Sequence, residues 1–420
     1  MAFYLPENPD YTITDSLRDS VRFVMEASLT KYRGRICAKS SFLDQYGNIM
    51  HWHDFGDLEG PGWAANSIGG AWHLLRWARF ASRPDVEQVA LSLIDHTLLD
   101  GFVDRSSGFI FPYRDTARDE LCLNFKHNSD WLCPGSMARV AWQMLCVSDL
   151  VDPPRAAQLT QAALGWWEWY RSHVKPAPNR WVPRRCTPTG EGYTLSAEGG
   201  EDPFFAASAD GLFVLDLMAE LTRRGLRDCT HELFALCELF VSSGGLFASI
   251  NHDTYDAHES VAYAVAFRTL LRSAQVLDRP DLARWAYQTC LSGLDRFKMS
   301  EDRNGVQTTG LLWMEESWDT AYLWENAEAA AAYVDAFAQT ADTRYIRDAL
   351  TILRAIAKHH HGPYGFLTEG VDWNNHVGAQ HHFGGAEYGD IQYTEPLLNN
   401  LHIAEPTLAI LERFPEVTAL

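Results

Sequence analysis

One pattern recurs along the chain and limits what it can fold into. A loop that contains glycine and aromatic residues leads into an apolar helical segment, and a tight turn then leads into an amphipathic one. Four loops show it clearly: Gly108-Phe-Ile-Phe-Pro, Gly245-Leu-Phe-Ala-Ser, Gly310-Leu-Leu-Trp-Met and Gly365-Phe-Leu-Thr-Glu. The unit returns at intervals of roughly 50–75 residues, which is the spacing expected of a helical hairpin with a variable loop. The sequence therefore predicts a series of helical hairpins.

Helical periodicity dominates the segments between the loops and predicts an all-α protein. If the first helix pairs with the last, twelve helices form six hairpins, which can close into an (α/α)6 barrel of six inner and six outer helices. This makes residues 1–420 a single domain. An open helical solenoid is the alternative, although the loops differ greatly in length and the repeats share little sequence. The expected helices are 15–32, 63–82, 84–99, 130–150, 153–174, 205–224, 228–243, 258–277, 281–297, 318–339, 343–360 and 395–414.

The helices that follow long loops are the less charged ones, as in 63–82, 205–218, 258–271 and 318–336. A helix that is apolar all round is buried, so these should form the inner ring. Their N-termini and the long loops then lie at one end of the barrel, where we expect a funnel. The longest loop, 365–396, contains aromatic residues throughout, which argues against disorder. We expect it to form one wall or the lid of the funnel.

Carboxylates occur at the start of each expected inner helix. Capping explains many of them, because Asp and Glu are favoured in a first helical turn. It does not explain runs such as Met314-Glu-Glu-Ser-Trp-Asp319, in which two adjacent acids stand between two tryptophans. The wider set comprises Asp54, Asp57, Glu59, Asp130, Glu201, Asp202, Asp210, Asp253, Asp256, Glu259, Glu315, Glu316, Asp319, Glu387, Asp390 and Glu395. From it we select Asp130, Glu316, Asp319 and Glu387 as catalytic candidates.

Tryptophans accompany these acids in loops and at helix starts. A sugar ring stacks its C–H face on an indole and offers hydroxyls to carboxylates, imidazoles and amides, so the pairing favours a saccharide site over core packing and capping alone. Arginines in the same loops could bind a substrate carboxylate as a bidentate fork, with a uronic acid as the natural ligand, or form local salt bridges. The substrate-binding candidates are Trp52, His53, Asp54, Arg114, Trp131, Arg184, His258, Trp313, Trp318, Trp373, His382 and Tyr388.

Two kinds of chemistry fit these residues. Glycoside cleavage needs one protonated and one ionised carboxyl group on either side of the bond, and we expect Glu316 or Asp319 to work with Asp130 or Glu387. Alternatively, a tyrosine and a histidine near a sugar C–H could act as base and acid in an elimination or an epimerisation. The pairs available for that are Tyr255 with His258 and Tyr388 with His382.

Composition excludes several other classes. The net charge of -20 argues against nucleic acid or an anionic membrane as a partner. The first residues lack the features of a signal peptide, and no apolar run is long enough to span a membrane. The eight cysteines show no close-paired spacing, which indicates a reduced, cytoplasmic protein without a structural zinc site. We find no phosphate loop or dinucleotide motif, and no cofactor or metal is predicted. A zinc site formed by His376, His381, His382 and nearby acids stays an alternative, although the spacing matches no known motif. Oligomerisation is left open.

With these features the chain resembles the six-hairpin (α/α)6 toroid group of carbohydrate-active proteins. The group includes unsaturated glucuronyl hydrolases, related β-glucuronidases, toroid polysaccharide lyases and N-acylglucosamine 2-epimerase-like enzymes. The resemblance is architectural and covers nearly the whole chain, and no catalytic role is carried over. It implies a glycoside hydrolase acting on a small oligosaccharide, one with a uronic acid being the natural choice. The alternatives are a lyase or epimerase that uses Tyr and His, and a non-catalytic sugar-binding or scaffold protein.

Overall fold

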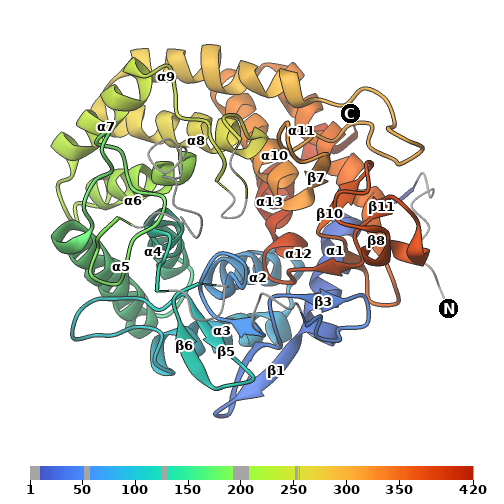
Figure 1. Cartoon of the computed structure of the whole chain (residues 1–420), viewed down its shortest axis with the longest axis horizontal. Helices are drawn as coiled ribbons and strands as arrows, with labels where there is room; N and C mark the ends of the chain where they lie inside the picture. Colours follow the sequence, from blue (N-terminus) through green and yellow to red (C-terminus); the bar gives the residue numbers. More distant parts are fainter. Residues whose placement is uncertain are drawn as a thin grey trace, which may run out of the picture.

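The computed structural model describes residues 10–51, 57–124, 130–192, 208–250, 254 and 256–419. Its helices form two concentric rings (Figure 1). The inner ring consists of α2 (Ser67–Ala81), α4 (Pro134–Ser148), α6 (Leu212–Arg223), α8 (Ser260–Leu277), α10 (Leu323–Thr340) and the consecutive helices α12 (Asn399–His402) and α13 (Ala404–Arg413). The outer ring consists of α1 (Ile13–Phe23), α3 (Pro84–Leu99), α5 (Pro153–His173), α7 (Thr230–Ser242), α9 (Pro280–Trp285) with its π-helical continuation Ala286–Leu291, and α11 (Thr343–Ile356).

The inner ring is closed. Each inner helix contacts the next, from α2 through α4, α6, α8 and α10 to α13, and α13 contacts α2 again. The outer helix α1 packs on α12 and α13, so the first helix completes the last hairpin. The predicted (α/α)6 barrel is therefore confirmed, and the open solenoid is wrong.

The burial of the helices follows their sequence patterns. In α10 every residue from Leu323 to Val334 is buried, and the alanine run within it allows its neighbours to approach closely. The outer helix α11 instead buries only one face, on which Ile346, Ala349, Leu350 and Leu353 lie. These are the patterns expected of an inner and an outer helix. Within the described residues, no helix has the length and apolar character needed to cross a membrane, and all eight cysteines are free thiols.

Several helices begin later than predicted, and at two helix ends the boundary differs because a strand forms in place of the expected helical turns. The segment expected to be helical from 15 to 32 leaves the α-helix after Phe23 and ends as β1 (Leu29–Tyr32), paired with β2 (Arg35–Ala38). The turn between these strands uses positive φ at Arg33 and Gly34, as in tight hairpins. Likewise α10 begins at Leu323 rather than at 318, because Thr320–Tyr322 forms strand β7.

Short antiparallel sheets cover the end of the ring at which the inner helices begin, which we call the mouth. One sheet joins β4 (Leu58–Glu59), β5 (Tyr113–Asp115) and β6 (Glu120–Cys122), and another joins β7 to β10 (Gly370–Asp372) and β11 (Gly389–Asp390). Strand β12 (Tyr393–Thr394) pairs with β3 (Leu43–Asp44), and β8 (His360–His361) pairs with β9 (Phe366–Leu367). The long loop 365–396 is thus ordered, and its strands pair with β3 near the start of the chain and with β7 and β8.

Asp390 holds part of this loop in place. Its carboxylate lies 2.9 Å from His359 Nδ1 and 2.6 Å from His361 Nε2. Burial opposes the charged form, but the two imidazoles outweigh it and hold the pKa of Asp390 well below its ordinary value. The ionised carboxylate therefore stabilises the folded loop.

We expect Asp390→Asn to destabilise the protein by about 1.5–3 kcal/mol, the usual contribution of hydrogen bonds to a charged group. Because the folded pKa is depressed, this contribution is complete above the ordinary carboxyl pKa of 3.8 and is lost as pH falls below it. Amide hydrogen exchange over 365–396 would report the loosening at pH 7. The exposed Glu387 lies in the same loop, and Glu387→Gln should leave exchange unchanged. Equal protection in wild type and Asp390→Asn would contradict the assignment.

Below the mouth, the inside of the ring contains a layer of buried ion pairs. We call it the ionic layer. Arg268 of α8 contacts Glu328 at 2.5 Å, Asp335 at 2.8 Å and also Glu405. Arg139 of α4 lies 3.3 Å from Glu328, and His402 Nε2 lies 2.8 Å from the same carboxylate. Arg272 pairs with Asp216 at 2.6 Å. Five inner helices are cross-linked in this way, so the centre of the ring is filled at this level.

Candidate active site at the mouth of the barrel

Three buried carboxyl groups lie where consecutive inner helices begin. Asp210 is in the short turn before α6, Glu259 immediately precedes α8, and Glu315 is in the segment that leads to β7 and α10. Glu259 and Glu315 are paired by an antiparallel bridge, and the Ser260 N–H donates to the Met314 carbonyl at 2.9 Å. The fold thus gathers acids from three successive hairpins.

Two of these carboxyl groups have pKa values raised well above the ordinary carboxyl range. Burial, followed by repulsion from Glu259, raises the pKa of Glu315 to about 8, although Ser249 Oγ lies 2.5 Å from its Oε2. Burial raises the pKa of Asp210 to about 7, against the opposing effect of Arg184. The Glu259 carboxylate accepts the Ile250 N–H. Carboxyls whose environments push their pKa values upward beside an ionisable partner are the usual arrangement for acid–base catalysis.

Aromatic rings lie between the three carboxyl groups and the ionic layer. The half-buried Trp63, just before α2, has its ring 5.4 Å from Phe213 and 5.0 Å from Trp324. The Arg139 guanidinium lies 5.4 Å from the Phe213 ring on the inner side, and the His402 ring lies 6.0 Å from Trp324. Trp63 is the only one of the three aromatic side chains that is partly exposed. It offers an apolar surface suited to the face of a sugar ring.

The catalytic candidates chosen from sequence lie elsewhere on the mouth. Asp130, Glu316 and Glu387 are exposed, and Glu316 pairs with Arg296 at 3.2 Å. Asp319 is half-buried and accepts a hydrogen bond of 2.7 Å from Asn374. None of the four has the buried setting of Glu315, which is adjacent in sequence to Glu316.

Several predicted binding residues gather in two groups. In the first, His258 Nδ1 lies 2.8 Å from the Tyr263 hydroxyl, and the Trp313 indole N–H donates to the Arg296 carbonyl at 3.2 Å. Burial, followed by Arg296, lowers the pKa of His258. This group also contains Glu316 through its pair with Arg296.

The second group joins the end of the 313–319 segment to the long loop. The Trp318 ring lies 3.9 Å from His376, and the buried His382 contacts Asp372 at 3.1 Å. Trp373 is buried with the Arg303 guanidinium 5.5 Å from its ring. Two segments far apart in sequence are therefore in contact.

The remaining candidates have varied positions. Trp131 is buried under the Arg185 guanidinium at 4.6 Å, and the buried Arg184 donates to the Thr254 carbonyl at 2.5 Å. Tyr388 is half-buried. Trp52, His53 and Asp54 lie outside the described residues.

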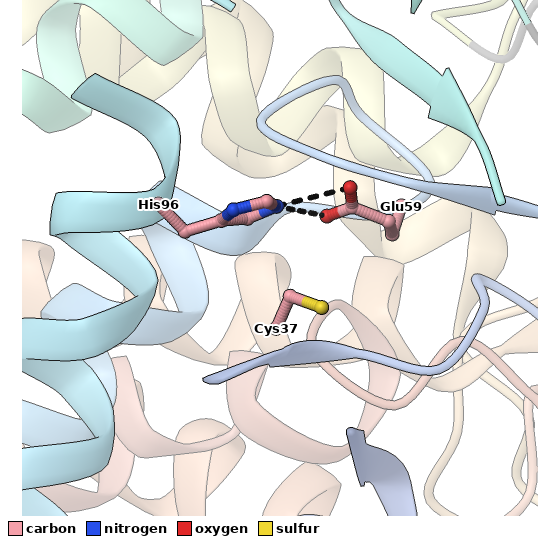
Figure 2. A group of neighbouring side chains, drawn as sticks. All are labelled: Cys37, Glu59 and His96. Carbon is pink, nitrogen blue, oxygen red and sulfur yellow. Dashed lines mark hydrogen bonds and ion pairs between the residues drawn. The ribbon is translucent and has the colours of Figure 1, made fainter. Parts of the chain in front are cut away.

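Arg114 lies in a buried cluster behind β4 rather than facing a ligand. Its Nε donates to Glu59 Oε1 at 2.7 Å, and its guanidinium lies 3.7 Å from the Tyr32 ring. His96 projects from α3 towards Glu59, with Cys37 beside them (Figure 2). His96 also contacts Asp100 at 2.8 Å. The guanidinium is thus engaged by the protein's own carboxylate and ring.

Cys37, Glu59 and His96 place potential metal-ligand atoms within 4.8 Å of one another. However, the Arg114 guanidinium hydrogen-bonds Glu59 and also lies within reach of the Cys37 thiol. Burial and Glu59 raise the pKa of Cys37 to about 12. Although burial opposes it, Glu59 and Asp100 raise the pKa of His96. The Arg114 guanidinium already pairs with Glu59, and the raised pKa of Cys37 disfavours the thiolate that a metal would need, so these residues do not fit a resident metal ion.

Removing the Arg114 guanidinium should create a metal site. In Arg114→Ala we expect Zn²⁺ to raise the melting temperature, because Cys, Glu and His are suitable zinc ligands once the competing cation is gone. Wild type should not respond, and adding Cys37→Ser to the variant should abolish the response. Thermal melts with Zn²⁺ and with a chelator test this. Equal stabilisation of wild type would show that Arg114 does not replace a metal.

Asp210, Glu259 and Glu315 all belonged to the wider set of acids at the expected helix starts, and none was selected as catalytic. Capping could account for Asp210 and Glu259, whereas Glu315 lies in the Met314–Asp319 run that capping does not explain. One signal was present: Asp210 and Asp216 interrupt a largely apolar run from Phe204 to Met218. A charged residue within an apolar segment is informative because buried charges are rare without a partner or a function. No comparable signal distinguished Glu315 from Glu316.

Comparison with known proteins agrees with this architecture. No protein-family model and no curated protein matches the sequence. Among solved structures, the chain is similar to cellobiose 2-epimerase from Bacillus thermoamylovorans, at 12% identity over 96% of this chain and 99% of that one, with a TM-score of 0.65. It is similar to D-mannose isomerase at 10% identity over 98% and 100%, with a TM-score of 0.58. A possible member of the GH105 family from Salmonella enterica matches at 13% identity over 99% and 100%, with a TM-score of 0.51.

At such low identity these likenesses establish the fold. The chain has the (α/α)6 toroid fold, and the resemblance inferred from its hairpins is confirmed at that level. Because epimerase, isomerase and GH105 structures all share the fold, it does not select a reaction.

Proposed function

We propose that this protein is a carbohydrate-processing enzyme that hydrolyses a glycosidic bond in a small oligosaccharide by carboxyl acid–base catalysis. The observation that carries the proposal is the buried cluster of Asp210, Glu259 and Glu315, in which burial raises the pKa of Asp210 to about 7 and that of Glu315 to about 8. The partly exposed Trp63 ring supports a saccharide as the ligand. The fold supports it further, since the similar structures carry the names of sugar-converting enzymes.

In this proposal Glu315 is the general acid. Its carboxyl proton passes to the glycosidic oxygen as the bond to the anomeric carbon breaks, and the leaving sugar departs as an alcohol. Glu259 acts as the base that takes a proton from the attacking water. Asp210 interacts electrostatically with Glu259, and its own raised pKa makes it the reserve proton donor.

A second candidate is a sugar epimerase or isomerase. The favouring observation is His258, whose lowered pKa leaves a neutral imidazole at pH 7 hydrogen-bonded to Tyr263. A neutral imidazole can remove a proton next to a sugar carbonyl. Elimination from a uronic acid would use the same pair, and the Arg184 and Arg185 side chains near Asp210 would favour such an acidic sugar.

Product analysis separates these reactions. The protein would be incubated in D₂O with cellobiose, mannose and a uronate-containing disaccharide and followed by proton NMR and ultraviolet absorbance. Hydrolysis yields new reducing ends without deuterium on carbon, whereas epimerisation or isomerisation exchanges a carbon-bound proton. Elimination creates an absorbing double bond. Hydrolysis would support the proposal, exchange or elimination would favour the second candidate, and no conversion or binding of any sugar would reject both.

A further inference from the structure

We infer that Ser249 is a positioning residue that holds the proton of Glu315 and is itself held in place by the preceding hairpin. This inference rests on the proposed role of Glu315 and adds the residue that controls it. Ser249 is buried, with its Oγ 2.5 Å from Glu315 Oε2 and 3.4 Å from the Asp256 carbonyl oxygen. One hydroxyl therefore stands between a carboxyl group and a second acceptor.

The position of Ser249 is determined by a line of hydrogen bonds from the neighbouring repeat. The Trp181 indole N–H donates to the Ser208 carbonyl at 2.8 Å, and Ser208 Oγ donates to the Ser249 carbonyl at 2.9 Å. A parallel bridge joins Ser208 to Ala248. Trp181, Ser208 and Ser249 are all fully buried. The loop before α8 is thus anchored to the entrance of α6, which leaves the Ser249 hydroxyl little freedom except rotation.

Rotation of that hydroxyl can serve both protonation states of Glu315. When Glu315 is protonated, its O–H donates to Ser249 Oγ, and the serine O–H donates to the Asp256 carbonyl. When the Glu315 proton has passed to the glycosidic oxygen, the serine O–H turns and donates to the new carboxylate. The serine keeps its own hydrogen throughout, so Ser249 neither gains nor loses a proton during the transfer.

The other groups around Glu315 act on the same equilibrium. Glu259 and Asp256 favour the protonated form of Glu315 by repulsion, whereas the hydrogen bond from Ser249 favours the ionised form. Burial also favours the protonated form of Glu315. Ser249 is therefore the donor whose removal should leave the new carboxylate less well stabilised after proton transfer.

The test replaces Ser249 by Ala, Cys and Thr. Glu315 would be titrated directly in each variant by the infrared band of its protonated carboxyl, assigned by its loss in Glu315→Gln. We expect Ser249→Ala to raise the pKa of Glu315 by about one unit and to move the alkaline limb of the pH–rate profile upward with it. Cysteine is a weaker donor of similar size, so Ser249→Cys should shift the Glu315 pKa and the alkaline limb in the same direction. Ser249→Thr keeps a hydroxyl, so its pKa and alkaline limb should stay near those of wild type.

Ser242→Ala serves as the matched control. Ser242 is exposed on α7 and its hydroxyl bonds only the Leu239 carbonyl, at 3.2 Å. An unchanged Glu315 titration in folded Ser249→Ala and Ser249→Cys, or an equal shift in Ser242→Ala, would overturn the inference. If the titration moves as expected while no sugar is converted, the positioning role stands and the proposed hydrolysis fails. If turnover falls while the titration is unchanged, the positioning role fails instead.

Discussion

Replacing Glu315 by glutamine is expected to lower turnover roughly 10²–10⁴-fold, the usual contribution of a general acid. Gln has the shape of the protonated carboxyl but cannot release a proton to a leaving group. Steady-state rates on the substrate found by product analysis provide the measurement. Glu316→Gln is the matched control, since Glu316 is adjacent in sequence but exposed. It should retain at least half of wild-type turnover.

The same substitution should change how stability depends on pH. The pKa of Glu315 is raised from its ordinary value of 4.5 to about 8 in the folded protein. A carboxyl group whose pKa is higher in the folded than in the unfolded protein does not change the free energy of unfolding below its unfolded pKa. As pH rises from the unfolded pKa to the folded pKa, the group lowers that free energy increasingly. Glu315→Gln should therefore gain stability relative to wild type between about pH 5 and 8. Thermal melts across that range would show the two curves separating.

These two readouts together identify the role of Glu315. Loss of turnover with a stable fold at pH 8 is the result expected of a buried acid that reacts. Full turnover in Glu315→Gln would end its assignment as the acid and would return attention to Asp130, Glu316, Asp319 and Glu387. A stability loss at pH 8 would show instead that the carboxyl is ionised and paired in the folded state.

Arg268→Ala is expected to be the most destabilising single change in the ring, at about 3–5 kcal/mol. Arg268 is buried and contacts Glu328, Asp335 and Glu405. Its removal leaves these carboxylates close together with one positive charge fewer, and an unpaired buried charge costs far more than an exposed one. Urea unfolding followed by circular dichroism gives the change in midpoint.

Arg344→Ala is the control for that experiment. Arg344 pairs with Asp342 at 2.6 Å, but its side chain is 79% exposed. A solvated pair of this kind contributes about 0–1 kcal/mol. If the two variants unfold at similar urea concentrations, the ionic layer does not hold the inner helices together as we argue.

The relation between sequence and site is clearest at residues 313–319. The acids and tryptophans of this segment predict a functional role for it, and the segment lies at the mouth of the ring, where the sequence analysis expected it. The selection of Glu316 over Glu315 could not be made from sequence, because both are acids in the same loop. The bridge between Glu259 and Glu315 determines which of the two is buried. That bridge joins residues of two different hairpins.

Trp63 and Arg114 also show that the role of a side chain cannot be predicted from the sequence around it. Trp63 was one of several tryptophans at helix starts, and only the packing of Phe213 and Trp324 around it distinguishes it from the others. Arg114 was a candidate for binding a ligand carboxylate, with a local salt bridge as the alternative, and the pairing of β4 with β5 brings it against Glu59. In both cases the deciding neighbour is distant in sequence.

The sequence by itself determined the six hairpins, the inner and outer helices and the end of the barrel at which polar loops gather. These features follow from periodicity and turn residues, which act over a few positions along the chain. The tertiary structure alone decided which acids share a buried site and which lie in solvent. Protonation at the mouth depends on desolvation and on charges from other hairpins, and neither exists until the ring has closed.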